Sequence, residues 1–191
     1  MKSRFLLAAT ILVAGALCGC QTHAEKKYGY PAVIARMGES PGFPSQAAGF
    51  SRGDTVTYEP GMKNISVGYN FFSTTAQQAV TFYFYPKSEP YAQQIESEKK
   101  MIERFHEGAV VLSQEKQLLR KGHSTFEAFV ANYRVEGVML NRKQPLYSQL
   151  ILIELPERYV KVRSTSPLNQ AEEADRRVRE LMQQIDWTKQ P

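Results

Sequence analysis

The stretch from Ile65 to Pro86, ISVGYNFFSTTAQQAVTFYFYP, constrains the fold of this chain more than any other. Its first half alternates apolar residues with polar or small ones, a period of two that places one set of side chains on one face of a sheet. Its second half, 79–85, is almost unbroken in β-branched and aromatic residues, which is typical of a strand covered on both faces. With a polar turn between them, the two halves predict a central β-hairpin that lines a core.

The same patterning predicts the remaining elements. We expect strands at 50–58, 110–119, 125–138, 146–155 and 158–164, and helices at 88–107 and 167–185. The run 150–153 is apolar at every position, so it should form a central strand. The order is therefore three strands, a helix, four strands and a helix (βββαββββα). It predicts an α+β fold with a mainly antiparallel sheet of about seven strands covered by helices, in an α/β/α sandwich.

Side chains of the C-terminal helix divide between core and solvent. An apolar stripe should face the sheet, and Trp187 should plug an edge of the core. The arginines of the helix are expected on its solvated face: Arg176, Arg177 and Arg179. Tyrosines are favoured in interfaces and in sheet cores alike, and for those of the strands we expect the core: Tyr69, Tyr83, Tyr85, Tyr133, Tyr147 and Tyr159.

The first twenty residues have the layout of an exported protein. Lys2 and Arg4 precede an apolar run at 5–17, which small residues follow. This run of about 13 residues falls short of the ~20 that a transmembrane helix needs. We therefore expect a signal peptide that is removed, and its loss would lower the formal charge of the chain from +5 to +3.

The expected cleavage site resembles the lipobox of bacterial lipoproteins. Leu17-Cys18-Gly19-Cys20 places an apolar residue three positions before a cysteine and a small residue immediately before it. The resemblance implies cleavage between Gly19 and Cys20, and attachment of diacylglycerol and further acyl chains such as palmitate to Cys20. Cys18 departs from the usual pattern, in which a small or hydroxylated residue is more common at that position. The alternative is an ordinary signal peptide cut nearby, with Cys20 left as a free thiol.

The lipobox also implies a location. Two or three acyl chains, at ~0.8 kcal/mol per buried methylene, hold a protein at a membrane. In the resembling family the residue after the cysteine biases sorting, and Gln21 is not the aspartate that retains lipoproteins in the inner membrane. In a Gram-negative cell this favours the outer membrane, with the protein facing the periplasm.

These features predict a simple domain organisation. Residues 1–19 are the signal peptide, residues 20–49 a flexible tether rich in proline and small residues, and residues 50–191 a single α+β domain. A short ordered piece at 32–35 is the alternative to a wholly disordered tether. Cys20 would be the one cysteine left after export, so we expect neither a disulfide nor a thiolate metal site.

The element order resembles the fold shared by the photosystem PsbP proteins and related bacterial lipoproteins. The resemblance covers 50–187 and includes the closing Ile185-Asp186-Trp187. Domains of that group act mainly as accessory or docking modules on membrane-associated assemblies. Because a fold does not fix a function, this sets only an expectation.

Little in the sequence predicts catalysis or cofactor binding. Glu103 and His106 form an E-x-x-H pair, but a carboxylate-bridged di-iron site needs two such pairs and further glutamates. His23 falls in the tether and His123 in a predicted turn, so the histidines have no convincing metal-ligand spacing. We therefore expect no catalytic residue, no metal and no cofactor.

The resulting prediction is a lipid-anchored periplasmic module without catalytic activity, which binds or supports a partner in the cell envelope. The alternative is an envelope enzyme of hydrolase type, or a small-ligand carrier, that uses a pocket between sheet and helix. Positive charge in the predicted loop 142–145 and at Arg120-Lys121 is a weaker hint of binding. Nucleic acid is not an expected partner, because basic residues do not cluster with interleaved aromatics.

Overall fold

The computed structural model describes residues 35–37, 42–58 and 63–189. The strands are β1 (Ala35–Met37), β2 (Gln46–Ala47), β3 (Phe50–Thr57), β4 (Ile65–Phe72), β5 (Gln77–Pro86), β6 (Val110–Lys121), β7 (Ser124–Met139), β8 (Arg142–Glu154) and β9 (Arg158–Pro167). The helices are α2 (Tyr91–Phe105), a short 3₁₀ helix η1 (Leu168–Gln170) and α3 (Ala171–Gln184). None of the helices in these residues is long and apolar enough to cross a membrane.

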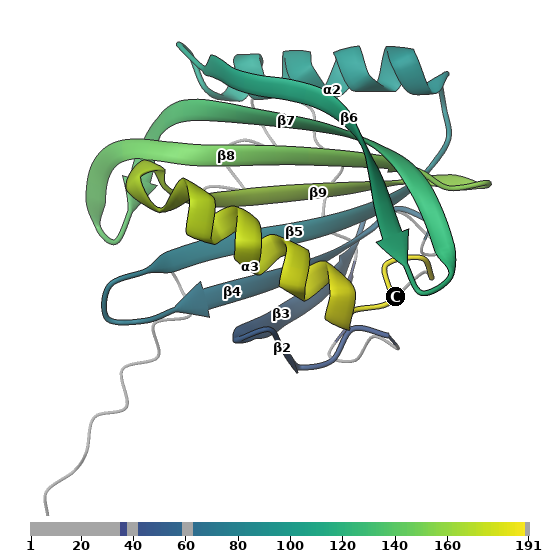
Figure 1. Ribbon diagram of the computed structural model, residues 1–191, viewed down its shortest axis with the longest axis horizontal. Helices are drawn as coiled ribbons and strands as arrows, with labels where there is room; N and C mark the ends of the chain where they lie inside the picture. The colour runs from purple at the N-terminus through teal and green to yellow at the C-terminus, as the bar shows by residue number, and fades with distance from the viewer. Residues whose placement is uncertain (1–34, 38–41, 59–62, 190–191) are drawn as a thin grey trace, which may run out of the picture. The chain divides into compact units, whose positions relative to one another are not determined.

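All of these strands belong to one antiparallel sheet (Figure 1). Its order is β1-β3-β4-β5-β9-β8-β7-β6, and β2 pairs with β3 beside this path. The sheet stays open, since β6 and β1 lie at opposite ends of the order. The predicted α+β class with a mainly antiparallel sheet is confirmed, and the predicted central hairpin is β4 and β5, which pair along the whole of β4.

The strands outnumber the expected seven because β1 and β2 come before residue 50. Residues 42–49, which the sequence predicts to be tether, contribute to the core. Phe43 is only 1% exposed, and its ring packs edge to face on Phe82 and Phe84. The domain therefore begins before Phe50. The prolines and glycines of 42–49, which resemble a linker in composition, form turns within a segment that packs on the core.

Other predictions about the N-terminal part fall on residues that the structure does not describe. The signal peptide at 1–19, the acylation site Cys20 and the tether up to residue 34 lie outside the described ranges. Of the possible ordered piece at 32–35, only Ala35 is described, as the first residue of β1.

The sheet has a filled core on each face. In one core, α3 packs on alternate residues of the central strands, with Phe82 and Val162 fully buried. In the other, Ile102 of α2 packs among side chains that include Tyr133 and Tyr159. Because successive strand residues point to opposite faces, each central strand contributes to both cores.

Strand β8 shows this division most clearly. Leu150 and Leu152 belong to the core under α2, and Ile151 and Ile153 belong to the core under α3. All four side chains are buried, so the prediction of a central strand covered on both sides is confirmed. A slip of one residue in register would exchange the two sets.

The end of the chain packs as expected, with one correction. Val178 and Leu181 of α3 are buried, and Trp187 is 1% exposed. Arg177, which the sequence predicts on the solvated face, is 7% exposed. Its guanidinium donates to Oε1 of Gln78 at 3.2 Å and lies 4.4 Å from the ring centre of Phe71. The long side chain is buried along its stem because its charge finds partners at the sheet surface.

The predicted loop after residue 140 is instead a two-residue turn. Strand β7 continues to Met139 and β8 begins at Arg142, so that Leu140 and Asn141 alone connect them. Both have positive φ, at 54° and 57°, as a type I′ turn requires. Asparagine tolerates this conformation, whereas for an ordinary side chain such as leucine it costs roughly 1–2 kcal/mol.

Candidate functional site

The residues singled out in the sequence are not brought together by the fold. Gly19 and Cys20 lie outside the described residues, so cleavage and acylation stay predictions. Glu103 is exposed on α2, and His106 follows as the C-terminal cap of that helix. Burial, and then Arg163, lower the pKa of His106. Within the described ranges no group of three or more His, Cys, Asp and Glu side chains has an arrangement that could hold a metal ion.

Two serine patterns in the chain resemble motifs of hydrolases. Residues 38–42, Gly-Glu-Ser-Pro-Gly, match the Gly-x-Ser-x-Gly spacing of a nucleophile elbow. An elbow leads from a strand into a helix, whereas Gly42 leads through a turn into β2. Ser-x-x-Lys spacing occurs at Ser97 and Lys100 on α2 and at Ser113 and Lys116 on β6, but both lysines are exposed, whereas an activated lysine is desolvated. Neither pattern therefore lies in the context that its chemistry requires.

The most strongly perturbed ionisable groups lie between α2 and the sheet. Glu98 is 6% exposed, and its Oε2 accepts a hydrogen bond from Lys161 Nζ at 3.0 Å. Its Oε1 accepts from the hydroxyl of Tyr85 at 2.8 Å and from Nε2 of Gln94 at 3.2 Å. The ammonium of Lys161 also lies 4.6 Å from the ring centre of Tyr83, a cation–π distance.

Burial dominates the electrostatics of this cluster. It lowers the pKa of Lys161, and the nearby Glu98 carboxylate acts in the opposite direction. It also raises the pKa of Tyr85. Perturbed pKa values are typical of active sites, but structural ion pairs show them as well. Because both oxygens of Glu98 are used by partners inside the protein, we interpret the cluster as a buried ion pair that positions α2.

Strand β6 is the more conspicuous surface feature. None of its 12 residues is buried, and Leu118 is 73% exposed. Among the described strands only β7 pairs with it, so its outer edge presents backbone donors and acceptors. Such an edge can accept an added strand from a partner. Its four charged side chains disfavour indiscriminate pairing: Glu115, Lys116, Arg120 and Lys121.

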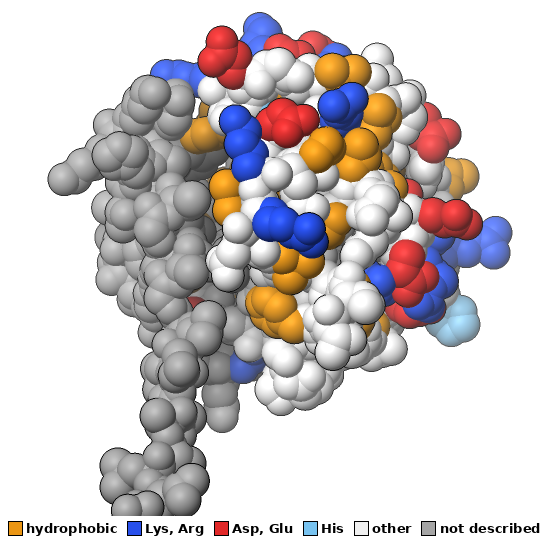
Figure 2. All heavy atoms as spheres, turned by 90° about the vertical axis from the view of Figure 1, so that its left-hand side faces the viewer, with side chains coloured by type: hydrophobic (Ala, Val, Ile, Leu, Met, Phe, Trp, Pro, Cys, Tyr) orange, Lys and Arg blue, Asp and Glu red, His pale blue; other side chains and the backbone are white. Residues whose placement is uncertain are grey.

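A second exposed surface lies where the β4–β5 and β7–β8 turns come together, at the left of Figure 1. The backbone N–H of Leu140 donates to Oε1 of Gln77 at 3.1 Å, which joins the two hairpins. Figure 2 views this end and shows hydrophobic side chains interspersed with Lys and Arg, and with some Asp and Glu. We call this surface the hairpin end and define it by five exposed residues: Phe72, Val138, Leu140, Arg142 and Lys143.

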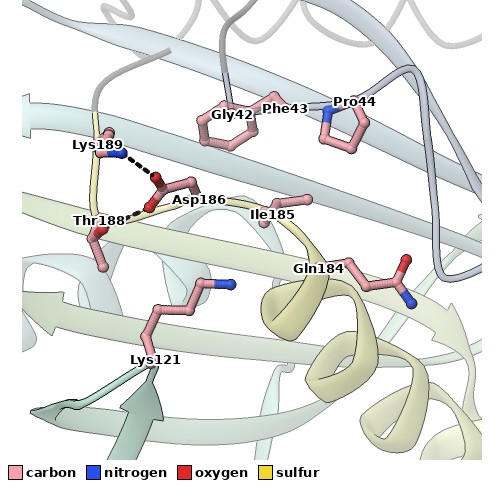
Figure 3. Close-up of a pocket in the computed structure, with 10 residues that line it drawn as sticks. Gly42, Phe43, Pro44, Lys121, Gln184, Ile185, Asp186, Thr188 and Lys189 are labelled. Carbon is pink, nitrogen blue, oxygen red and sulfur yellow. Dashed lines mark hydrogen bonds and ion pairs between the residues drawn. The ribbon is translucent and has the colours of Figure 1, made fainter.

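A hollow of about 720 Å³ lies between the end of α3 and the β6–β7 turn (Figure 3). It is lined by Gly42, Phe43, Pro44, Lys121, Gly122, Gln184, Ile185, Asp186, Thr188 and Lys189. Lys121 Nζ donates to the carbonyls of Met182 at 3.2 Å and Gln183 at 2.6 Å, where a cation stabilises the end of a helix. Asp186 pairs with Lys189 at 2.9 Å.

The hollow has few of the features of a ligand site. It is wide open to solvent, whereas small-molecule sites are deep and apolar with a few convergent polar groups. Its charged side chains already have partners in the protein.

Comparisons with known proteins add evidence on the fold. No family model matches the chain. No curated protein matches it either. The chain is similar to a crystal structure of PA94 from Pseudomonas aeruginosa, a protein of unknown function described as a candidate regulator, with a TM-score of 0.53 and 11% identity. The match covers 70% of this chain and 90% of that chain. At this identity the similarity shows the fold alone.

Proposed function

We propose that this protein is a bacterial envelope lipoprotein. It is acylated at Cys20 and held at the outer membrane, and its domain acts in the periplasm as a non-catalytic module that binds a protein partner. The observation that carries the proposal is the sequence Leu17-Cys18-Gly19-Cys20 directly after a signal-like apolar segment.

The form of the domain supports a docking role. Both faces of the sheet carry filled cores, and the charged groups at the hollow are paired. A hydrolase or a small-ligand carrier would need a deep cleft between sheet and helix, where Ile102 and Leu181 are instead completely buried. The exposed edge of β6 offers a partner protein the backbone groups for strand addition.

We also propose that the fold is the PsbP-like α/β/α sandwich. Its support is that α2 and α3 belong to separate cores, to which alternate residues of β8 contribute. The accessory and docking roles of the resembling group agree with the proposed function, although a shared fold alone would not establish it.

The test is metabolic labelling with a palmitate analogue, combined with a photo-crosslinker at Leu118 of β6. Wild type should carry the label and yield one crosslinked envelope protein. Cys20→Ser should lose the label, while Cys18→Ser, the matched control two positions away, should keep it. A labelled Cys20→Ser protein would refute acylation at this residue, and no crosslink from Leu118 would refute β6 as the docking edge.

A further inference from the structure

The turn between β7 and β8 holds Leu140 in the left-handed backbone conformation, which is unfavourable for an apolar side chain. Leu140 has φ 54° and is 40% exposed, so burial of its side chain only partly offsets the cost of the left-handed conformation. Asparagine or glycine would suit this position of a type I′ turn better. A strained residue that the surrounding contacts do not require points to a role outside the fold.

Leu140 is accompanied by other exposed apolar side chains at the hairpin end. Phe72 is 60% exposed and pairs across the strands with Gln77, the residue that accepts the Leu140 N–H. Val138, two residues before Leu140, is 72% exposed. By the alternation of the strands, Phe72 points to the α2 side of the sheet and Val138 to the α3 side. Both hairpin tips therefore expose apolar side chains, which water solvates poorly.

Basic residues flank the apolar side chains of the β7–β8 hairpin. Residues 134–143 include three basic residues and one acidic residue, and the acidic one, Glu136, lies 3.6 Å from Arg134. Arg142 and Lys143 are exposed immediately after the turn. The β4–β5 turn, residues 73–76, has no charged residue. The hairpin end therefore combines apolar tips with a net positive charge.

We propose that the hairpin end docks on a bilayer that contains anionic phospholipids, with Leu140 and Phe72 entering the headgroup region and Arg142 and Lys143 contacting the headgroups. A protein interface needs about 800 Å² of complementary surface on each partner. A few apolar side chains with adjacent basic charge are enough for a peripheral membrane contact. The inference rests on the proposed function, because acylation at Cys20 brings this surface to a membrane.

The length of chain before the domain permits this contact. Ala35 pairs with Thr57, which pairs with Ile65 at the opposite end of β4 from Phe72. The eight residues of β4 span about 24 Å. The fifteen positions from Cys20 to Ala35 reach up to about 50 Å when extended. The acylated residue and the hairpin end can therefore lie at the same bilayer surface.

The test is sedimentation of the full chain carrying Cys20→Ser, which cannot be acylated, with vesicles of phosphatidylcholine alone or mixed with phosphatidylglycerol. The apolar segment 5–17 is common to all variants, so its contribution cancels in comparisons. The variants are Leu140→Asn, Phe72→Ser and the double change Arg142→Gln/Lys143→Gln. The matched controls on β6 are Leu118→Ser and Lys116→Gln, which remove the same kinds of exposed side chain elsewhere.

The double change should lower partitioning onto anionic vesicles on the order of 25-fold, roughly fivefold for each charge, and should not affect partitioning onto neutral vesicles. Leu140→Asn should lower partitioning while leaving the unfolding midpoint unchanged or higher, which a structural role of Leu140 would not produce.

Partitioning equal to that of the β6 controls would overturn the proposal. The proposal would also be overturned if the variants kept vesicle binding but lost a crosslink between the hairpin end and an envelope protein, because the surface would then be a protein interface. Palmitate labelling of Cys20 is a separate readout, so each proposal can fail alone.

Discussion

Helices α2 and α3 both make buried or half-buried charged contacts with the sheet, but a buried tryptophan is added only at the end of α3. The charged contacts are those of Glu98 on α2, and of Asp175 and Arg177 on α3. The end of α3 leads into an aromatic plug, in which Trp187 packs on Phe126 at a ring-centre distance of 5.2 Å and donates its indole N–H to the carbonyl of Met182. Helix α2 instead lies over the buried ion pair of Glu98 and Lys161. The free energy gained by apolar burial is non-directional and does not depend on pH. A buried ion pair stabilises the fold only while both charged partners are present. Changes in charge and pH should therefore act at the charged contacts of α2 rather than at the apolar plug around Trp187.

The largest effect is expected at the aromatic plug. Trp187→Ala removes the largest fully buried side chain and should lower the free energy of unfolding by about 4 kcal/mol, through lost burial and the cavity left behind. Denaturant unfolding measures this, with the exposed Leu118→Ala as control. A loss below about 1 kcal/mol, the level of a typical single substitution, would show that the plug is dispensable.

The ion pair should give the next largest effect, with a characteristic non-additivity. Glu98→Ala leaves Lys161 buried without its carboxylate and should cost about 3 kcal/mol. Adding Lys161→Met removes the unpaired charge and should restore most of that loss. A double variant whose cost equals the sum of the two single costs would contradict a coupled pair.

A smaller effect concerns pH, at the end of α2. Burial and Arg163 lower the pKa of His106 below its ordinary value of 6.5. As the pH falls below that value, the unfolded chain takes up the proton before the folded chain does, so stability decreases toward the folded-state pKa. His106→Gln should flatten this decrease in unfolding experiments between mildly alkaline and mildly acidic pH. His123→Gln, on the β6–β7 turn, is the matched control, and an unaltered profile in His106→Gln would refute the assignment.

Elements with a clear period were predictable from the sequence. The alternation of Ile65, Val67 and Tyr69 in β4 fixes which side chains are buried, and all three are fully buried. The expectation that strand tyrosines lie in the core holds for Tyr69, Tyr133, Tyr147 and Tyr159, which are buried, while Tyr83 and Tyr85 are half-buried.

Features that depend on contacts distant in the sequence were not predictable. Glu98 and Lys161 lie on a helix and a strand 63 positions apart, and neither has a local signature of pairing. Arg177 is buried because Gln78, 99 positions away, accepts its hydrogen bond. The segment around Phe43 has the composition of a linker, and only the packing of its ring in the core reveals its role.

The hairpin end and the exposed edge of β6, on which the functional proposals rest, were only partly predictable from the sequence. The sequence predicts exposed charge at Arg142 and Lys143, but the apolar tip formed by Leu140 depends on a turn without the Asn-Gly signature. The exposure of β6 depends on its place at the edge of the sheet order, which strand patterning does not determine.

The most direct test of the account is mass spectrometry of the protein purified from the membranes of the cells that make it. We predict a mature chain that begins at Cys20 and carries a diacylglyceryl group on the sulfur of that residue. An N-terminus after residue 20, or a Cys20 without acyl groups, would contradict the account.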